Sequence, residues 1–316
     1  MLDIKLIRSN PKKIADNCHK RNVNVDIEKL LILDEKVRQF TTEIDSIRAR
    51  RNDLSSKMKK DIPNFERGPL IEESKNLRED EYQKEEVLRK MINDRNNILK
   101  QIPNLTHPDV PDGFSDEDNL PIKQVGTIRE FDFEPKDHVE LMENLDLIDF
   151  DGGSKVTGQK FYYLKNQAVF LELALVQYAL NLPQKEGFII HITPDLARDK
   201  ILDGIGFNPR GKETQIYAIE ESDLCLIATA EITLGGLLKD KILSADQLPV
   251  LYAGFSHCYR TEAGASGRES KGLYRVHQFS KIEMFAFTHP DKSDDVHERM
   301  LNIEEKIYQD LEIPYQ

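Results

Sequence analysis

Hydrophobic residues in the first third of the chain recur with the spacing of a coiled coil. Over residues 30–58 they follow one another in steps of three and four, and Arg51 is the one polar interruption. This seam predicts a long helix from Asp26, its N-cap, to about Lys60. At about 1.5 Å per residue, such a helix is roughly 50 Å long.

A second and weaker seam over residues 70–102 predicts a partner helix that starts near Pro69 and ends at Pro103. Residues 61–68 interrupt the pattern between the two seams. Because this break is short, we expect the two helices to fold back as an antiparallel hairpin. Residues 1–26 predict a short helical cap at the start of this arm.

The pattern changes after a proline-rich linker at residues 103–113, and we divide the chain into an arm domain, 1–110, and a second domain, 111–316. The pair Gly152-Gly153 is expected to break the chain. Strands are predicted at 161–164, 187–194, 216–219, 224–228, 251–262 and 276–287, and helices at 137–145, 167–182, 195–205, 232–238 and 294–311. Strands joined by hairpins rather than by helical crossovers predict an α+β domain, an antiparallel sheet flanked by helices.

Composition narrows the class of protein without adding a site. The chain has 316 residues, 32% of them charged, and a formal net charge of −12. It contains no long apolar run, signal segment or transit peptide, which predicts a soluble cytoplasmic protein with no membrane partner. Its three cysteines lie far apart in the sequence and form no C-x-x-C pair, so we expect neither a zinc site nor disulfides.

One basic stretch stands out near the predicted tip of the arm. Residues 48–60 contain six lysines and arginines and a single acid, Asp53. A solvated helix face accounts for a charge run of this kind, and so does a surface that attracts a phosphate backbone. The candidate nucleic-acid contacts are Arg48, Arg50, Arg51 and Lys57.

The most informative chemistry lies in a glycine-containing hairpin at residues 258–284. Four cations fall within sixteen residues, namely Arg260, Arg268, Lys271 and Arg275. Arginine makes bidentate bonds to phosphate and carboxylate groups. The ring of Phe279 offers a flat face for a purine, Glu262 can accept from the amine of that base, and Glu283 suits an ammonium group. An ordinary charged hairpin explains each residue alone, but the combination favours a polyphosphate site.

The cysteine and histidines of this hairpin are less promising. His257 and Cys258 are adjacent in a predicted strand, so their side chains should face opposite ways. We therefore expect structural roles for these two residues and for His277 rather than a nucleophile or a metal site.

Residues 259–283 closely resemble motif 2 of class II aminoacyl-tRNA synthetases, in the form used by the seryl-tRNA synthetase family. The family pattern is (F/Y)-R-x-E-A-G-x-x-G-x-x-x-x-G-L-x-R-x-H-Q-F-x-K-x-E, and this sequence matches every fixed position. The resemblance extends over the whole chain, including the coiled-coil arm, the Ile102-Pro-Asn linker and the stretches at 210–217 and 226–231.

This resemblance implies a ligase that activates L-serine with ATP and Mg²⁺ and transfers it to tRNA(Ser). It implies that Arg260 and Glu283 are catalytic residues. By the same resemblance, serine is bound by Thr229, Ala230, Glu231, Arg260 and Glu283, and ATP by Arg260, Thr261, Glu262, Arg275, Val276 and Phe279. A plain role as the first-turn acid of a helix remains an alternative for Glu231.

The resemblance also implies that the arm grips the long variable arm of tRNA(Ser) and that the loop at 263–274 meets its acceptor end. It implies a homodimer through motif 1, at residues 187–195, where Pro194 supplies one of the two usual prolines. Motif 3, which carries a second ATP-binding arginine, would follow Gln316. Two alternatives therefore stay open, a synthetase-like RNA-binding paralogue and an inactive fragment lacking motif 3, and we expect ATP–pyrophosphate exchange by residues 1–316 to be near background.

Overall fold

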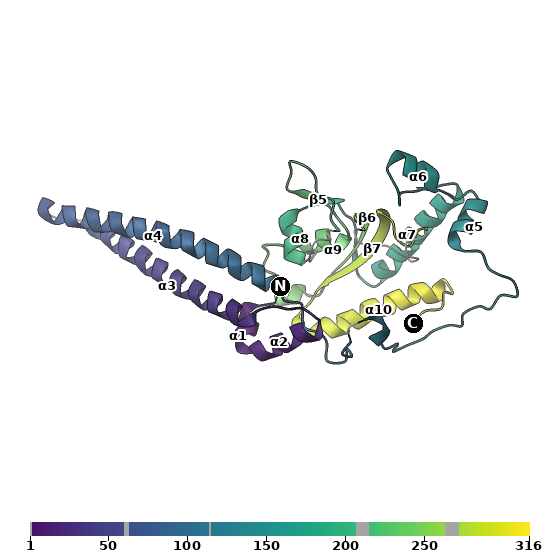
Figure 1. The fold of residues 1–316 in the computed structure, drawn as a ribbon, viewed down its shortest axis with the longest axis horizontal. Helices are drawn as coiled ribbons and strands as arrows, with labels where there is room; N and C mark the ends of the chain where they lie inside the picture. Colours follow the sequence, from purple (N-terminus) through teal and green to yellow (C-terminus); the bar gives the residue numbers. More distant parts are fainter. Residues whose placement is uncertain (1, 60–62, 114, 207–214, 263–271) are drawn as a thin grey trace. The chain divides into compact units, whose positions relative to one another are not determined.

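A computed structural model describes residues 2–59, 63–113, 115–206, 215–262 and 272–316. The chain divides into two compact units, residues 1–120 and 121–316 (Figure 1). The first unit contains the arm, and the second contains the predicted hairpin at 258–284. Much of the loop of that hairpin, residues 263–271 with Arg268 and Lys271, lies outside the described residues, as does the 207–214 stretch.

The first unit is a helical hairpin preceded by two short helices. Its elements are α1 (Ile4–Ser9), α2 (Pro11–Lys20), α3 (Ile27–Met58) and α4 (Asn64–Leu99). Asp26 is the N-cap of α3, as predicted, and its Oδ1 accepts from the backbone N–H of Lys29 at 2.8 Å. The predicted start of the second helix was wrong, because α4 begins at Asn64 and carries Pro69 inside. A proline this close to the N-terminus removes only one intrahelical bond, so the helix continues through it.

The seam read from the sequence is the contact between the two long helices. Apolar residues of α3 are buried along its whole length, and these are Leu30, Val37, Ile44, Ile47 and Leu54. The polar interruption at Arg51 is also accommodated, because its guanidinium pairs with Glu81 of α4. At the base of the arm, Ile7 of α1 and Ile14 of α2 pack with Leu30 and Leu99 in one cluster. The charged residue Asp34 is also buried there, with 1% of its surface exposed.

The second unit is built on a three-stranded sheet in the order β3-β6-β7. The strands are β3 (Ile189–Ile192), β6 (Val250–Tyr259) and β7 (Gln278–Phe287), and two small sheets pair β1 (Ile148–Asp149) with β2 (Tyr163–Leu164) and β4 (Leu196–Arg198) with β5 (Leu224–Leu226). The helices are α5 (His138–Asn144), α6 (Phe150–Val156), α7 (Gln167–Lys185), α8 (Asp199–Ile205), α9 (Ala230–Gly236) and α10 (Ser293–Asp310). The α+β class is confirmed, and β6 and β7 form the predicted antiparallel pair. One edge differs from the prediction, because β3 runs parallel to β6.

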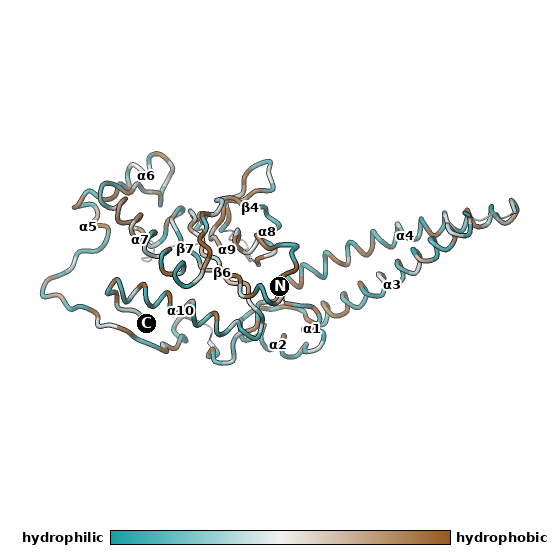
Figure 2. Tube along the Cα trace, turned by 180° about the vertical axis from the view of Figure 1, so that it is seen from behind, coloured by the Kyte–Doolittle hydropathy of each residue, from teal (hydrophilic) through white to brown (hydrophobic). Residues whose placement is uncertain are grey.

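Helices cover both faces of this sheet (Figures 1 and 2). On one face, Leu251 and Ala253 of β6 pack against Leu182 of α7 and Ile303 of α10. On the other face, α9 approaches the sheet closely at Gly254. A Cβ added to Gly254 would lie 3.0 Å from Leu234 of α9 and 3.0 Å from Thr193. The absence of a side chain at Gly254 therefore sets the distance between α9 and the sheet.

Several predicted boundaries were wrong. The Gly152-Gly153 pair lies inside α6 instead of breaking the chain, because Gly153 packs against the backbone at Phe161, where a side chain would clash. The helix predicted at 195–205 begins only after β4, and α7 continues past Pro183 to Lys185. The strand predicted at 216–219 is reduced to a single bridge between Ala218 and Cys225. Within the described residues, no helix combines the length and apolar character needed to cross a membrane.

Candidate active site

The candidate site lies on the face of β6 and β7 that α9 approaches. Because side chains alternate along a strand, every second residue of each strand points to this face. Cross-strand pairing places Cys258 opposite Phe279, Ser256 opposite Lys281, and Gly254 opposite Glu283. The alternation in β7 therefore puts an aromatic ring, an ammonium group and a carboxylate in one row.

Arg260 follows directly after β6 and continues this row. Its guanidinium carbon lies 5.1 Å from the ring centre of Phe279, within the range of a cation–π contact. Its Nε is buried and has no hydrogen-bond partner among the described residues. An unpaired donor on a buried guanidinium is costly unless a ligand completes it, so this group is well suited to an anionic substrate.

Glu262 is held in a conformation that few non-glycine residues adopt, with φ of 48°. Its backbone N–H donates to Oε1 of Gln215 at 2.9 Å, and its Oε2 accepts from Arg275 at 3.0 Å. The preceding residue, Thr261, donates its N–H to the carbonyl of Gln215 at 3.3 Å. Val276 is buried, with 5% of its surface exposed. The structure thus brings all the residues predicted to bind ATP to one end of β6 and β7.

His277 braces this end of the sheet. Its Nδ1 lies 2.9 Å from the carbonyl oxygen of Arg260 and 3.1 Å from the hydroxyl of Tyr217. The prediction that His257 and Cys258 face opposite ways is confirmed, because Cys258 is fully buried whereas His257 lies on the exposed side near Asp195. Burial raises the pKa of the Cys258 thiol, which favours the inert thiol form.

The residues predicted to bind serine meet where α9 begins. Thr229 is the N-cap of α9 and is 2% exposed, and its hydroxyl donates to Oε2 of Glu283 at 2.7 Å. Ala230 is fully buried beside it. Burial, and then the nearby Glu283, raise the pKa of Glu231 above its usual range, while Lys281 opposes them. The two carboxylates and Thr229 form a small polar cluster, which we call the carboxylate pocket because it is where serine is predicted to bind.

The four cations predicted to contact nucleic acid lie on α3 and are all ion-paired. The partners are Glu81 and Glu85 for Arg48, Glu73 for Arg50, Glu81 for Arg51 and Asp53 for Lys57. Four of these pairs cross between α3 and α4, so they also hold the hairpin together. The sequence pattern did not reveal these four pairs, because their acidic members lie 23 to 37 positions away in the chain.

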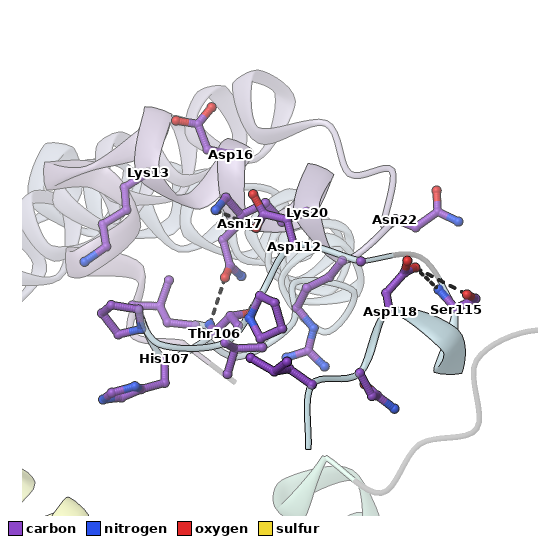
Figure 3. Close-up of a pocket in the computed structure, with 18 of the residues that line it drawn as sticks. Lys13, Asp16, Asn17, Lys20, Asn22, Thr106, His107, Asp112, Ser115 and Asp118 are labelled. Atoms are coloured by element: carbon purple, nitrogen blue, oxygen red, sulfur yellow. Dashed lines mark hydrogen bonds and ion pairs between the residues drawn. The ribbon is translucent and has the colours of Figure 1, made fainter. Parts of the chain in front are cut away.

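A separate cavity of about 1150 Å³ lies in the first unit, between α2 and the segment at 105–120 (Figure 3). Asn17 spans its wall, where Nδ2 donates to the carbonyl of Asn104 at 3.2 Å and Oδ1 accepts from the N–H of Thr106 at 2.9 Å. Both polar atoms of this buried side chain are therefore already used, and none of the predicted site residues lines the cavity.

Known proteins match both units. Residues 215–316 match the class II core domain of tRNA synthetases for glycine, histidine, proline, serine and threonine. This domain and the motif 2 face define a class II aminoacyl-tRNA synthetase. Residues 1–106 match the N-terminal domain of seryl-tRNA synthetase.

Individual relatives narrow the family. The serine–tRNA ligase of Rubrobacter xylanophilus is 51% identical over 315 residues, which are 100% of this chain and 74% of that protein. The serine–tRNA ligase of Borrelia garinii is 50% identical with the same coverage. The crystal structure of seryl-tRNA synthetase from Pyrococcus horikoshii complexed with ATP superposes with a TM-score of 0.84 at 35% identity, covering 100% of this chain and 76% of that one. The chain belongs to the seryl-tRNA synthetase family, and so to a family of ligases.

Sequence reasoning missed two residues of this site. Gln215 accepts from the backbone N–H of Glu262. It lies in the stretch 210–217, which resembles the family, but nothing in that stretch indicated this contact. Lys281 contacts both Thr229 and Glu283. Its position two residues from both Phe279 and Glu283 could have revealed it, because residues two apart in a strand share a face.

Proposed function

We propose that this protein activates L-serine with ATP and transfers the seryl group to tRNA(Ser). The observation that carries the proposal is the single row of Arg260, Phe279 and Glu283 beside the carboxylate pocket. In the first step, the serine carboxylate attacks the α-phosphorus of ATP. The bond to the bridging oxygen breaks, and pyrophosphate leaves. In the second step, a hydroxyl at the tRNA acceptor end attacks the seryl carbonyl and releases AMP.

On the nucleotide side, the ring of Phe279 would stack on adenine, and Glu262 would accept from its amino group. Arg260 would bind the α-phosphate and the serine carboxylate, and Arg275 the γ-phosphate. Catalysis here is mainly alignment and charge neutralisation. The described residues hold no group of three or more His, Cys, Asp or Glu side chains arranged for a metal ion. Mg²⁺ would bind the ATP phosphates and spread the developing charge there.

On the amino-acid side, Glu283 would bind the serine ammonium or hydroxyl, and Thr229 and Glu231 would line the pocket beside it. In this pocket Thr229 is buried, and Glu231 and Glu283 are half-buried. Alanine would leave these groups without the bond that the serine hydroxyl makes. Pockets that bond a hydroxyl discriminate strongly against analogues that lack it.

We further propose a homodimer in the cytoplasm. The outer surface of α7 and β3 is unusually apolar, since Phe170 is 69% exposed, Leu173 58%, Ile189 58% and Ile192 83%. Exposed apolar groups at this density mark interfaces more often than free surface. We expect the variant Phe170→Glu/Leu173→Glu to sediment as a monomer in analytical ultracentrifugation and the unaltered protein as a dimer. If the variant stays dimeric, α7 is not part of the dimer interface.

The central test is serine-dependent ATP–pyrophosphate exchange by the product of the complete reading frame, with residues 1–316 assayed in parallel. We expect exchange with L-serine, near-background exchange with alanine, and a loss of about a hundredfold or more in Arg260→Ala, the range for removing one transition-state donor. Tight tRNA binding without exchange would favour the RNA-binding paralogue instead.

We propose that the arm binds tRNA(Ser) through Arg48, Arg50, Arg51 and Lys57. Their replacement by alanine should weaken binding and flatten its salt dependence by roughly one unit per lost phosphate contact. The matched control removes four exposed lysines outside the tip, namely Lys12, Lys13, Lys29 and Lys36. Equal losses in the two variants would mean that overall charge, rather than the arm tip, determines the affinity.

A further inference from the structure

Lys281 is the residue of the site face for which neither the resemblance nor the ATP chemistry supplies a role. It lies between Phe279 and Glu283 in β7, and its side chain is 33% exposed. Its Nζ donates to the hydroxyl oxygen of Thr229 at 3.0 Å and pairs with the carboxylate of Glu283. The ammonium group therefore lies inside the carboxylate pocket.

The contacts of this lysine select one oxygen of Glu283. The Thr229 hydroxyl donates to Oε2, and Lys281 pairs with the same oxygen. Thr229 in turn accepts from Lys281 and, at 3.3 Å, from the backbone N–H of Glu231, so its hydroxyl is fully used. Among the contacts of the described residues, both bonds therefore fall on Oε2, and Oε1 of Glu283 is the oxygen left for a ligand.

The charge balance of the pocket depends on the same residue. Burial and the nearby charge of Glu283 both raise the pKa of Glu231, so ionisation of Glu231 is harder than that of a free carboxyl group. The other titratable groups near them are Cys258, a neutral thiol, and Arg260, whose cation lies over Phe279. In the part of the chain that the structure describes, Lys281 is the cation that touches Glu283 directly. With it, the empty pocket carries about one net negative charge, which one substrate ammonium group would neutralise.

We propose that Lys281 is a positioning residue for serine, which supplies a cation beside the two carboxylates and presents Oε1 of Glu283 to the substrate. This inference rests on the proposed serine-activating function. Without Lys281, two neighbouring carboxylates would lack a cation, and one of them would hold a proton near neutral pH. The protonated carboxyl would bind an ammonium group poorly until the pH rose high enough to remove that proton.

The test compares Lys281→Met with Lys281→Arg, each in the product of the complete reading frame, in pyrophosphate exchange between pH 6 and 9. We expect Lys281→Met to raise the KM for serine about tenfold at low pH, the effect of roughly one pKa unit, and to recover toward pH 9. Lys281→Arg should retain a nearly flat profile, because it keeps the cation. The KM for ATP should change little in both variants, because among the described residues Lys281 contacts Thr229 and Glu283, which are predicted to line the serine pocket, and none of the residues predicted to bind ATP.

Two outcomes would overturn the proposal. A rise in the serine KM that is equal at every pH would indicate a structural role only. A lower KM would show that Lys281 competes with the substrate for the pocket.

A measurement without serine separates this inference from the proposed function. It is a carbon-13 NMR titration of the Glu231 and Glu283 carboxyl groups, assigned with the variants Glu231→Gln and Glu283→Gln. If the wild type lacks exchange, the proposed function fails, and unchanged titrations in Lys281→Met would reject the role of Lys281 independently.

Discussion

Asp34, a buried charge at the base of the arm, allows a quantitative prediction. Its carboxylate is 1% exposed and faces three arginines. Arg8 Nε lies 3.0 Å from Oδ2, Arg38 Nε 3.4 Å from Oδ2, and Arg95 Nη1 3.4 Å from Oδ1. These residues come from α1, α3 and α4, so one carboxylate joins three helices. The perturbation is Asp34→Ala, which leaves the three cations facing each other.

The magnitude follows from the exposure of the partners. Removing one member of a fully buried ion pair costs about 3–5 kcal/mol, and a net hydrogen bond to a charged group contributes about 1.5–3 kcal/mol. The arginine side chains are 34%, 55% and 22% exposed, so water can solvate them once the carboxylate is gone. We therefore expect Asp34→Ala to lower the free energy of local unfolding at the arm base by about 2–3 kcal/mol.

Hydrogen–deuterium exchange measured by mass spectrometry reports this local stability without unfolding the second unit. A loss of that size should accelerate exchange in peptides from the first turns of α3 by roughly 30-fold to 150-fold. The matched control is Asp45→Ala, whose carboxylate is 65% exposed and lies 3.6 Å from Arg48. It should change the stability by less than about 0.5 kcal/mol. Equal exchange in the two variants would refute the reasoning from burial.

Two further predictions concern the site face. Gly254→Val should force α9 away from the sheet and lower both the melting temperature and serine affinity in calorimetry, whereas Gly204→Ala, which meets no atom within 4 Å, should change neither. Similar losses in both glycine variants would contradict the role given to Gly254. Because the pKa of Glu231 is raised in the folded state, that state keeps its proton to higher pH than the unfolded chain, and stability falls as pH rises above about 4.3. Relative to wild type, Glu231→Gln should therefore become increasingly stable as pH rises through that window, and a constant difference in urea unfolding would contradict the shift.

The long helix α3 could be predicted from the sequence, because the periodicity that defines a helix is a local property. The seam, the N-cap at Asp26 and the end of α3 near Met58 all follow from residues within a few turns. The start of α4 could not be predicted, because a proline early in a helix permits both a start and a continuation. The ion pairs of Arg48 and Arg51 with Glu81 depend on how two helices align, which no short stretch of sequence contains.

The site shows the same limit. Alternation along residues 278–287 predicts which side chains share a face, and the structure places Phe279, Lys281 and Glu283 together as that rule requires. The contacts of Thr229 with Lys281 and Glu283, and of Gln215 with Glu262, span more than forty residues of sequence and depend on tertiary packing. The parallel pairing of β3 with β6 was missed for the same reason. The two strands are separated by the 57 residues between Ile192 and Val250, so no short stretch of sequence indicates that they pair.

The hydroxyl of Thr229 has a consequence for changing the specificity of this protein. One oxygen atom both starts α9 and bonds the carboxylate that faces the substrate. A substitution that reshapes the pocket at Thr229 would also remove a helix cap, at a cost of about 1 kcal/mol. Selection for a new amino acid at this position would thus be coupled to a loss of folding stability. Changes at Glu231 or Lys281 avoid that coupling, since neither side chain caps a helix, and they offer the more accessible route to altered specificity.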